Sequence, residues 1–191
     1  MKTLLMRLAT LAVGLALLAV GASAQNANDA ELTAQLKKLF PTAATFSAKT
    51  GSPAHYKAFG PGAGGKEGEL LGLAYWTTEL EPLERGFDGP IKMLVGLNPA
   101  GEIAGVIVTD HREPYGYFSV DLPEWPKQFE GKSIRDAFKV GTDVDAITRA
   151  TITVTSSSRA IRNASRKVAR AHLAPPSPPA AGAAPAATTA Q

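Results

Sequence analysis

Two apolar runs joined by a short turn segment constrain the fold more than any other feature of this sequence. Ile91–Leu97 and Ile103–Thr109 are rich in aliphatic residues, and Asn98–Gly101 separates them with the sequence NPAG. A short loop with Pro and Gly between two such runs is a hairpin signal. A third run, Leu70–Thr78, is apolar and aromatic. We therefore predict a small antiparallel sheet.

Helical patterns lie on either side of these runs. Leu32, Leu36 and Leu39 recur at helical spacing, which predicts a helix over Glu31–Phe40 with Asn28 as its cap. Further on, Ser156–Ser158 is expected to cap a second helix. Its apolar stripe would consist of Ile161, Ala164, Val168 and Ala171. The predicted fold class is therefore α+β, an antiparallel sheet packed with helices in a single domain.

Basic residues surround this second stripe, namely Arg159, Arg162, Arg166, Lys167 and Arg170. Charge runs of this kind usually form a solvated face, and contact with an acidic partner or anionic lipid is the alternative. The aromatic residues Trp125 and Phe129 precede the second helix and are expected to anchor the core.

Both ends of the chain differ in composition from the middle. Residues 1–24 have two early basic residues, an apolar stretch and the sequence ASA before Gln25, as a secretory signal does. An uncleaved membrane anchor is the alternative. Residues 174–191 are rich in Pro and Ala without a charged side chain, so we expect a disordered tail. The folded domain is then 25–173.

Charge and cysteine content exclude several classes of function. The formal net charge is +3, and loss of residues 1–24 would leave a nearly neutral body. Nucleic acid is therefore not expected as a partner, because phosphate binding needs an excess of positive charge. The chain has no Cys, which excludes disulfides, thiolate metal sites and iron–sulfur ligation within it.

The glycine-rich stretch Gly60–Glu67 is similar to a phosphate-binding loop. Gly60, Gly65 and Lys66 have the right spacing, but Glu67 stands where a Ser or Thr would hold magnesium. We interpret this stretch as a hairpin connection, with nucleotide binding as the alternative.

The stretch Val144–Thr153 is the best candidate for a site of chemistry. It holds Asp145 and then two hydroxyl residues, Thr148 and Thr151, three positions apart. An ordinary half-buried strand is the alternative, because Ile147–Thr155 alternates apolar and hydroxyl residues.

A second candidate segment follows the predicted strand that ends at Thr109. It has the sequence HREPYGY and contains His111, Glu113 and Gly116. Tyr115 and Tyr117 in this segment would each offer a flat apolar face for a ring, with a hydroxyl left for water. A polar loop with surface aromatics is the alternative. No further metal-binding group lies close in the sequence, so we do not propose a metal.

Together these segments resemble the FMN-binding domain family, found in subunits of the Rnf and sodium-pumping NADH:quinone reductase complexes and in the regulator of nitrous-oxide reduction. The family's attachment motif has Asp, two variable residues, Ser or Thr, Gly, Ala and Thr. Asp145, Thr148, Ala150 and Thr151 match it, and Arg149 stands in place of the Gly. His111, Glu113 and Gly116 match the family's loop of His, any residue, Glu, Thr, Pro, Gly and Leu.

The resemblance implies that a flavin transferase links FMN through its phosphate to Thr151. Asp145 would orient the hydroxyl or meet the transferase's metal, and Arg149 with the following helix N-terminus would hold the phosphate charge. The loop with Tyr115 and Tyr117 would lie against the flavin ring.

The implied function is electron relay between a membrane redox protein and a downstream acceptor, by a protein that is periplasmic or secreted after signal cleavage. Tethering suits this role, because it retains the flavin where free FMN is scarce and leaves its ring exposed. The sequence shows no machinery for converting a substrate, so we interpret the protein as an electron carrier more readily than as an enzyme. A flavin-free binding or regulatory module of the same fold is the alternative function.

Overall fold

The computed structural model describes residues 28–64 and 66–173, so the expected signal peptide and Pro/Ala-rich tail lie outside the described residues. Five strands form one antiparallel sheet in the order β1-β2-β3-β4-β5. Their bounds are β1 Thr45–Phe46, β2 Tyr56–Phe59, β3 Leu70–Trp76, β4 Lys92–Leu97 and β5 Ile103–Asp110. Each strand therefore pairs with its neighbours in the sequence.

The predicted hairpins are confirmed. The Asn98–Gly101 turn joins β4 to β5, and the Gly101 N–H donates to the Asn98 carbonyl at 3.0 Å. The glycine-rich stretch lies between β2 and β3, so it is a hairpin connection as predicted. The nucleotide-loop alternative is wrong, because that loop leads from a strand into a helix and here a strand follows.

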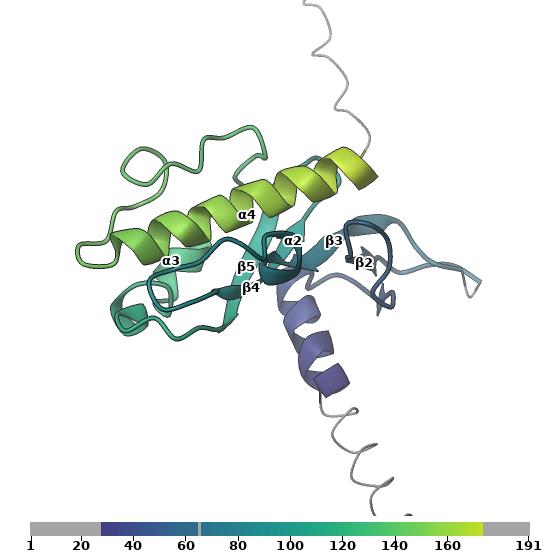
Figure 1. Cartoon of the computed structure of the whole chain (residues 1–191). Helices are drawn as coiled ribbons and strands as arrows, with labels where there is room; N and C mark the ends of the chain where they lie inside the picture. The colour runs from purple at the N-terminus through teal and green to yellow at the C-terminus, as the bar shows by residue number, and fades with distance from the viewer. Residues whose placement is uncertain (1–27, 65, 174–191) are drawn as a thin grey trace, which may run out of the picture.

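Helices cover both faces of the sheet (Figure 1). The long helix α4, Thr151–His172, crosses one face, and the helical segment 28–39 packs against the other. Successive side chains of a strand point to opposite faces, so Tyr75 packs on the α4 side and Ala74 on the side of residues 28–39. The predicted α+β class is thus confirmed. Asn28 is itself helical rather than a cap.

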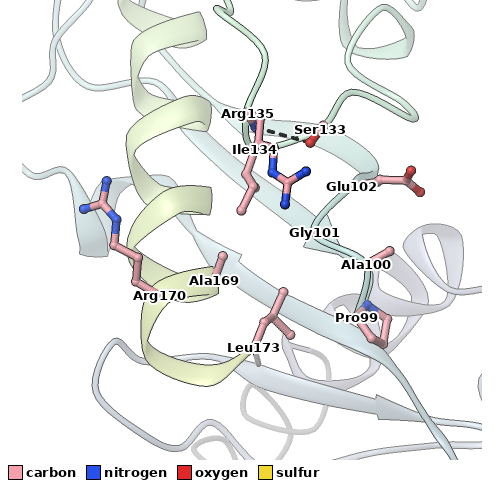
Figure 2. Close-up of a pocket in the computed structure, with 10 residues that line it drawn as sticks. All are labelled: Pro99, Ala100, Gly101, Glu102, Ser133, Ile134, Arg135, Ala169, Arg170 and Leu173. Carbon is pink, nitrogen blue, oxygen red and sulfur yellow. Dashed lines mark hydrogen bonds between the residues drawn. The ribbon is translucent and has the colours of Figure 1, made fainter. Parts of the chain in front are cut away.

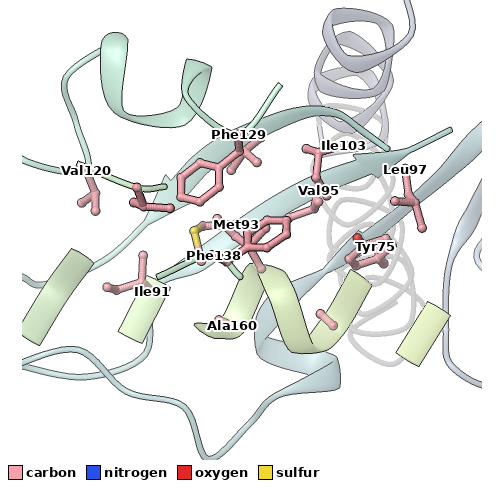
Figure 3. Packing of buried hydrophobic residues seen from close by; sticks show 14 of the residues in the cluster. Tyr75, Ile91, Met93, Val95, Leu97, Ile103, Val120, Phe129, Phe138 and Ala160 are labelled. Carbon is pink, nitrogen blue, oxygen red and sulfur yellow. The ribbon is translucent and has the colours of Figure 1, made fainter. Parts of the chain in front are cut away.

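The core beneath α4 is large and mostly aliphatic (Figure 3). Short connecting elements complete it, namely α2 Thr77–Leu80, η1 Gly116–Phe118 and α3 Glu124–Lys127. Trp125 and Phe129 are 3% and 0% exposed, which confirms them as core anchors. Tyr75 is fully buried and donates its hydroxyl proton to Ser165 Oγ at 2.6 Å. Burial raises the pKa of Tyr75, so its hydroxyl stays protonated as this donor role requires.

The strand alternative for this region and the expected helix cap are both wrong. Residues 147–155 form no strand, because α4 begins at Thr151, five residues before the expected cap at Ser156–Ser158. These serines are buried in the helix interior. Ser157 Oγ and Ser158 Oγ each donate to the carbonyl four residues earlier, at 2.7 Å. Such bonds satisfy buried hydroxyls within the helix. The three serines therefore lie inside α4 and do not mark its start.

The basic residues of α4 serve mainly to fasten neighbouring segments. Arg166 donates to the carbonyls of Ile134 and Asp136, at 2.7 and 2.8 Å. Arg159 pairs with Glu84 at 2.6 Å, and Lys167 donates to the Leu80 carbonyl. Arg159 and Lys167 still expose 50% and 49% of their side chains, so the predicted solvated face also makes contacts within the protein. Within residues 28–64 and 66–173, no helix is both long enough and apolar enough to span a membrane.

Candidate functional site

The amino end of α4 is the structural centre of the candidate site. A turn precedes it, in which the Ala150 N–H donates to the Ile147 carbonyl at 3.1 Å. Ala150 occupies the cap position and supplies no side-chain hydrogen bond, and the first turn contains no acidic residue. A helix of 22 residues thus begins with free N–H groups and no negative charge of its own to offset its dipole. Thr151 is the first helical residue, and it is exposed.

Arg149 has a positive φ of 69°. It is the third residue of the Ile147–Ala150 turn, a position where a positive φ is normally supplied by Gly or Asn. For an L-residue with a Cβ, this conformation costs about 1–2 kcal/mol. The geometry gives a physical reason why the resembled motif has Gly here.

A surface cavity of about 250 Å³ opens beside Thr151. It is lined by Phe87, Tyr115, Arg149, Ala150, Thr151, Ile152 and Thr153. Phe87 and Ile152 are 69% and 57% exposed, so two large apolar side chains at this cavity face solvent. Thr151 thus lines a cavity that is also lined by two aromatic residues, Phe87 and Tyr115.

Glu113 connects two segments that line this cavity. Its buried carboxylate accepts hydrogen bonds from the backbone N–H groups of Phe87 and Asp88, at 3.0 and 2.9 Å. The hydroxyl of the buried Thr153 also donates to it. The 86–88 loop is thereby attached to the first turn of α4.

His111 and Gly116 stand behind Glu113. Nδ1 of His111 accepts the backbone N–H of Glu113 at 3.1 Å, which leaves the ring proton on Nε2. Nε2 then faces Asp121 Oδ1 at 2.7 Å. A Cβ at Gly116 would clash with the His111 ring. His111, Glu113 and Gly116 therefore form the frame of the site and do not line the cavity.

The structure thus divides the site residues expected from the sequence. Thr151, Ala150, Arg149 and Tyr115 line one cavity. Asp145 and Thr148 are exposed and do not line it. Tyr117 is 68% exposed and packs edge-on against Phe118, with 4.8 Å between ring centroids.

Sequence reasoning missed Phe87, Ile152 and Thr153. The signal for Phe87 was present, because a large aromatic residue stands within a polar, glycine-containing segment, Arg85–Gly89. Thr153 carried no such signal, since its role depends on the helix that brings it to Glu113.

A larger cavity, of about 610 Å³, lies at the other end of α4 (Figure 2). Its walls are mostly apolar and include Pro99, Ile134 and Leu173, while the Arg170 side chain points away from the other lining residues. None of the expected site residues lines it. The smaller cavity is therefore the candidate site, despite its size.

Comparison with known proteins covers this region of the chain. The FMN-binding domain family model matches residues 86–166, a span that holds the cavity, the Glu113 frame and most of α4. The resemblance found in the sequence is thus confirmed over residues 86–166, which are similar to the FMN-binding domain family.

The relatives found are each named as a subunit of an ion-translocating oxidoreductase complex. The protein of Shewanella baltica (strain OS223) is 37% identical, over 41% of this chain and 42% of its own length. That of Haemophilus influenzae (strain PittEE) is 32% identical, over 54% and 51%. That of Escherichia coli (strain K12) is 37% identical, over 41% and 43%. The chain spans about half the length of the curated relatives it matches.

Proposed function

We propose that this protein carries FMN on Thr151 as a phosphoester and uses it to relay electrons. One observation carries the proposal: the exposed Thr151 is the first residue of a long, uncapped helix and lines a cavity that two aromatic residues also line. Each of these features suits one part of FMN, namely the phosphate or the ring.

The helix end suits the phosphate. A phosphodiester on Thr151 keeps one negative charge, and a helix N-terminus binds anions through its N–H groups and its dipole. Because Ala150 gives no cap and no acid lies in the first turn, nothing in the first turn competes for these N–H groups. The guanidinium of Arg149, two residues before Thr151, adds positive charge.

The cavity suits part of the flavin ring. Phe87 and Tyr115 offer flat apolar faces. Typical ligand cavities measure about 300–1,000 Å³, so one of about 250 Å³ leaves part of the ring outside. When bound, the flavin supplies the capacity to accept and donate electrons. The residues of this chain orient it and leave an edge open to a redox partner.

Attachment needs an outside enzyme, since an unaided Thr hydroxyl is a poor nucleophile. A flavin transferase would form the bond between Thr151 Oγ and the flavin's phosphorus. The hydroxyl proton leaves, and a dinucleotide flavin donor releases a nucleoside monophosphate. Asp145, six residues before Thr151 and exposed, is accessible to such an enzyme.

The proposed partners are this transferase and a membrane redox protein. The names of the relatives, subunits of an ion-translocating oxidoreductase complex, support a membrane partner. The signal-like residues 1–24 support export to the periplasm or beyond. A covalent link would keep the flavin on the protein in that compartment, because dilution cannot remove a tethered group.

Expression of the exported protein with a flavin transferase tests this function. Wild type should be yellow and should keep its colour through denaturation, while Thr151→Ala should lose the colour on unfolding. Thr148→Ala is the matched control and should stay labelled. A labelled Thr151→Ala variant would move the attachment site elsewhere.

The second candidate function, a flavin-free binding or regulatory module, is favoured by one observation. Arg149 places a long side chain at the turn position that suits Gly, beside the attachment residue. This function predicts that wild type stays colourless although the transferase labels a control protein, and that Arg149→Gly restores labelling.

A further inference from the structure

The loop that carries Phe87 is held by hydrogen bonds rather than by packing of its side chain. Phe87 is 69% exposed although it forms a wall of the cavity. Its backbone N–H and that of Asp88 point to the two oxygens of one carboxylate, that of Glu113. The orientation of this wall therefore depends on Glu113.

The third bond to Glu113 comes from a different segment that also lines the cavity. Thr153 lies in the first turn of α4, two residues after Thr151, and donates its hydroxyl to Glu113 Oε2. Three donors thus converge on one buried group. A carboxylate, which only accepts, suits such a place, whereas a glutamine amide would bring a donor toward another donor.

Gly86 gives an independent sign that the close approach is built in. A Cβ at this position would clash with Glu113 Oε1. The loop also closes on itself, since the Gly86 N–H donates to the Gly89 carbonyl at 2.7 Å. Only a residue without a side chain lets the loop sit on the carboxylate.

We propose that Glu113 is a positioning residue of the flavin site, with Gly86 and Thr153 as its partners. Its carboxylate clamps the 86–88 loop to the first turn of α4 and so places Phe87 at the cavity that Thr151 also lines. This inference rests on the proposed function for its purpose, but the clamp itself exists in the protein without flavin. Segment 111–117, which was expected to touch the flavin ring, therefore acts partly by holding the 86–88 loop in place through Glu113.

The first test uses the full chain without FMN. Hydrogen exchange at the amides of Phe87 and Asp88 should be about tenfold faster or more in Glu113→Gln, because a lost or mismatched hydrogen bond lowers local protection by roughly that factor. Thr153→Val, which keeps the carboxylate and the shape of the side chain, should show a smaller increase. Thr155→Val is the matched control on the same helix and should leave both amides unchanged. Unchanged exchange in Glu113→Gln would overturn the clamp.

The second test uses FMN-loaded protein and its visible circular dichroism, which reports how the ring is held. Gly86→Ala retains the carboxylate but pushes the loop away from it, so it should alter the flavin signal as Glu113→Gln does. Thr155→Val should resemble wild type. A wild-type signal in Gly86→Ala would overturn the positioning role, since the loop would then be irrelevant to the ring. If wild type takes up no FMN, the proposed function fails, and the exchange experiment still tests the clamp.

Discussion

At the scale of single residues, Arg149 has φ of 69° in the turn before α4. Gly adopts this angle without steric strain, whereas any residue with a Cβ is strained by it. Ala and Arg share this strain, so comparing Arg149→Gly with Arg149→Ala separates the backbone from the guanidinium. We expect Arg149→Gly to be more stable than Arg149→Ala, with a free energy of unfolding that is about 1 kcal/mol higher. Urea denaturation measures this difference, and equal stabilities would contradict a strained turn.

The two tyrosines of the 115–117 segment differ in their position relative to the cavity. Tyr115 lines it, while Tyr117 packs on Phe118. A tyrosine in contact with a flavin quenches its fluorescence, so FMN-loaded Tyr115→Ala should be clearly brighter than wild type. Tyr117→Ala should change the emission little and serves as the control. A larger rise in Tyr117→Ala would mean that the ring lies on the other side of the segment.

Part of the site could be predicted from the sequence, because the attachment pattern is local. Asp145 to Thr151 are seven consecutive residues, and their match to the family's motif suggested Thr151 as the attachment residue. The roles of His111 and Glu113 could not be predicted. Glu113 is 26 residues from Phe87 and 40 from Thr153, and only the folded chain brings these groups together.

At the scale of elements, the start of α4 shows why local patterns mislead. The alternation of Thr with Ile and Val over 147–155 fits a strand, and three serines in a row fit a cap. Neither pattern takes account of hydroxyl side chains that bond within a helix. Ser157, Ser158 and Ser165 instead bond the carbonyls one turn back, so α4 buries them with little loss of stability.

The carboxyl end of α4 holds a buried histidine contact with the loop before β2. His55 is 2% exposed, donates to the Pro53 carbonyl at 2.9 Å and lies 4.2 Å from the His172 ring. Burial lowers the pKa of His55 below its usual 6.5. The hydrogen bond to the Pro53 carbonyl raises this pKa and opposes the effect of burial, whereas His172 and Lys57 lower it further. The unfolded chain therefore takes up a proton first as the pH falls below 6.5.

This order of protonation fixes the sign of the pH dependence. The stabilisation from neutral His55 is present above pH 6.5 and is lost as the pH falls toward the lower pKa of the folded state. The melting temperature of wild type should fall between about pH 7.5 and about pH 5.5. His55→Gln should show a shallower fall, as measured by calorimetry. An equal slope in both proteins would mean that another group controls it.

At the scale of the whole molecule, the fold class followed from the order of apolar runs and turns. The β4–β5 hairpin has a turn that its sequence specifies, and the helix over 28–39 has a clear apolar stripe. The placement of the two helices on opposite faces was not predicted, because Leu73–Trp76 is apolar on both faces. Such a strand is buried on both sides, and its sequence alone does not say by what.

The site follows from this arrangement, since α4 crosses the sheet and brings its uncapped end to the loops that carry Phe87 and Tyr115.

Peptide mapping of protein exported with a flavin transferase tests most directly the central claim that Thr151 carries FMN. Trypsin cleaves after Arg149 and Arg159 and releases residues 150–159, which contain Thr151, Thr153 and Thr155. We predict that this peptide gains the mass of FMN less one water, and that its fragments place the group on Thr151. An unmodified peptide in protein whose co-expressed control is labelled, or a group on another residue, would contradict the proposal.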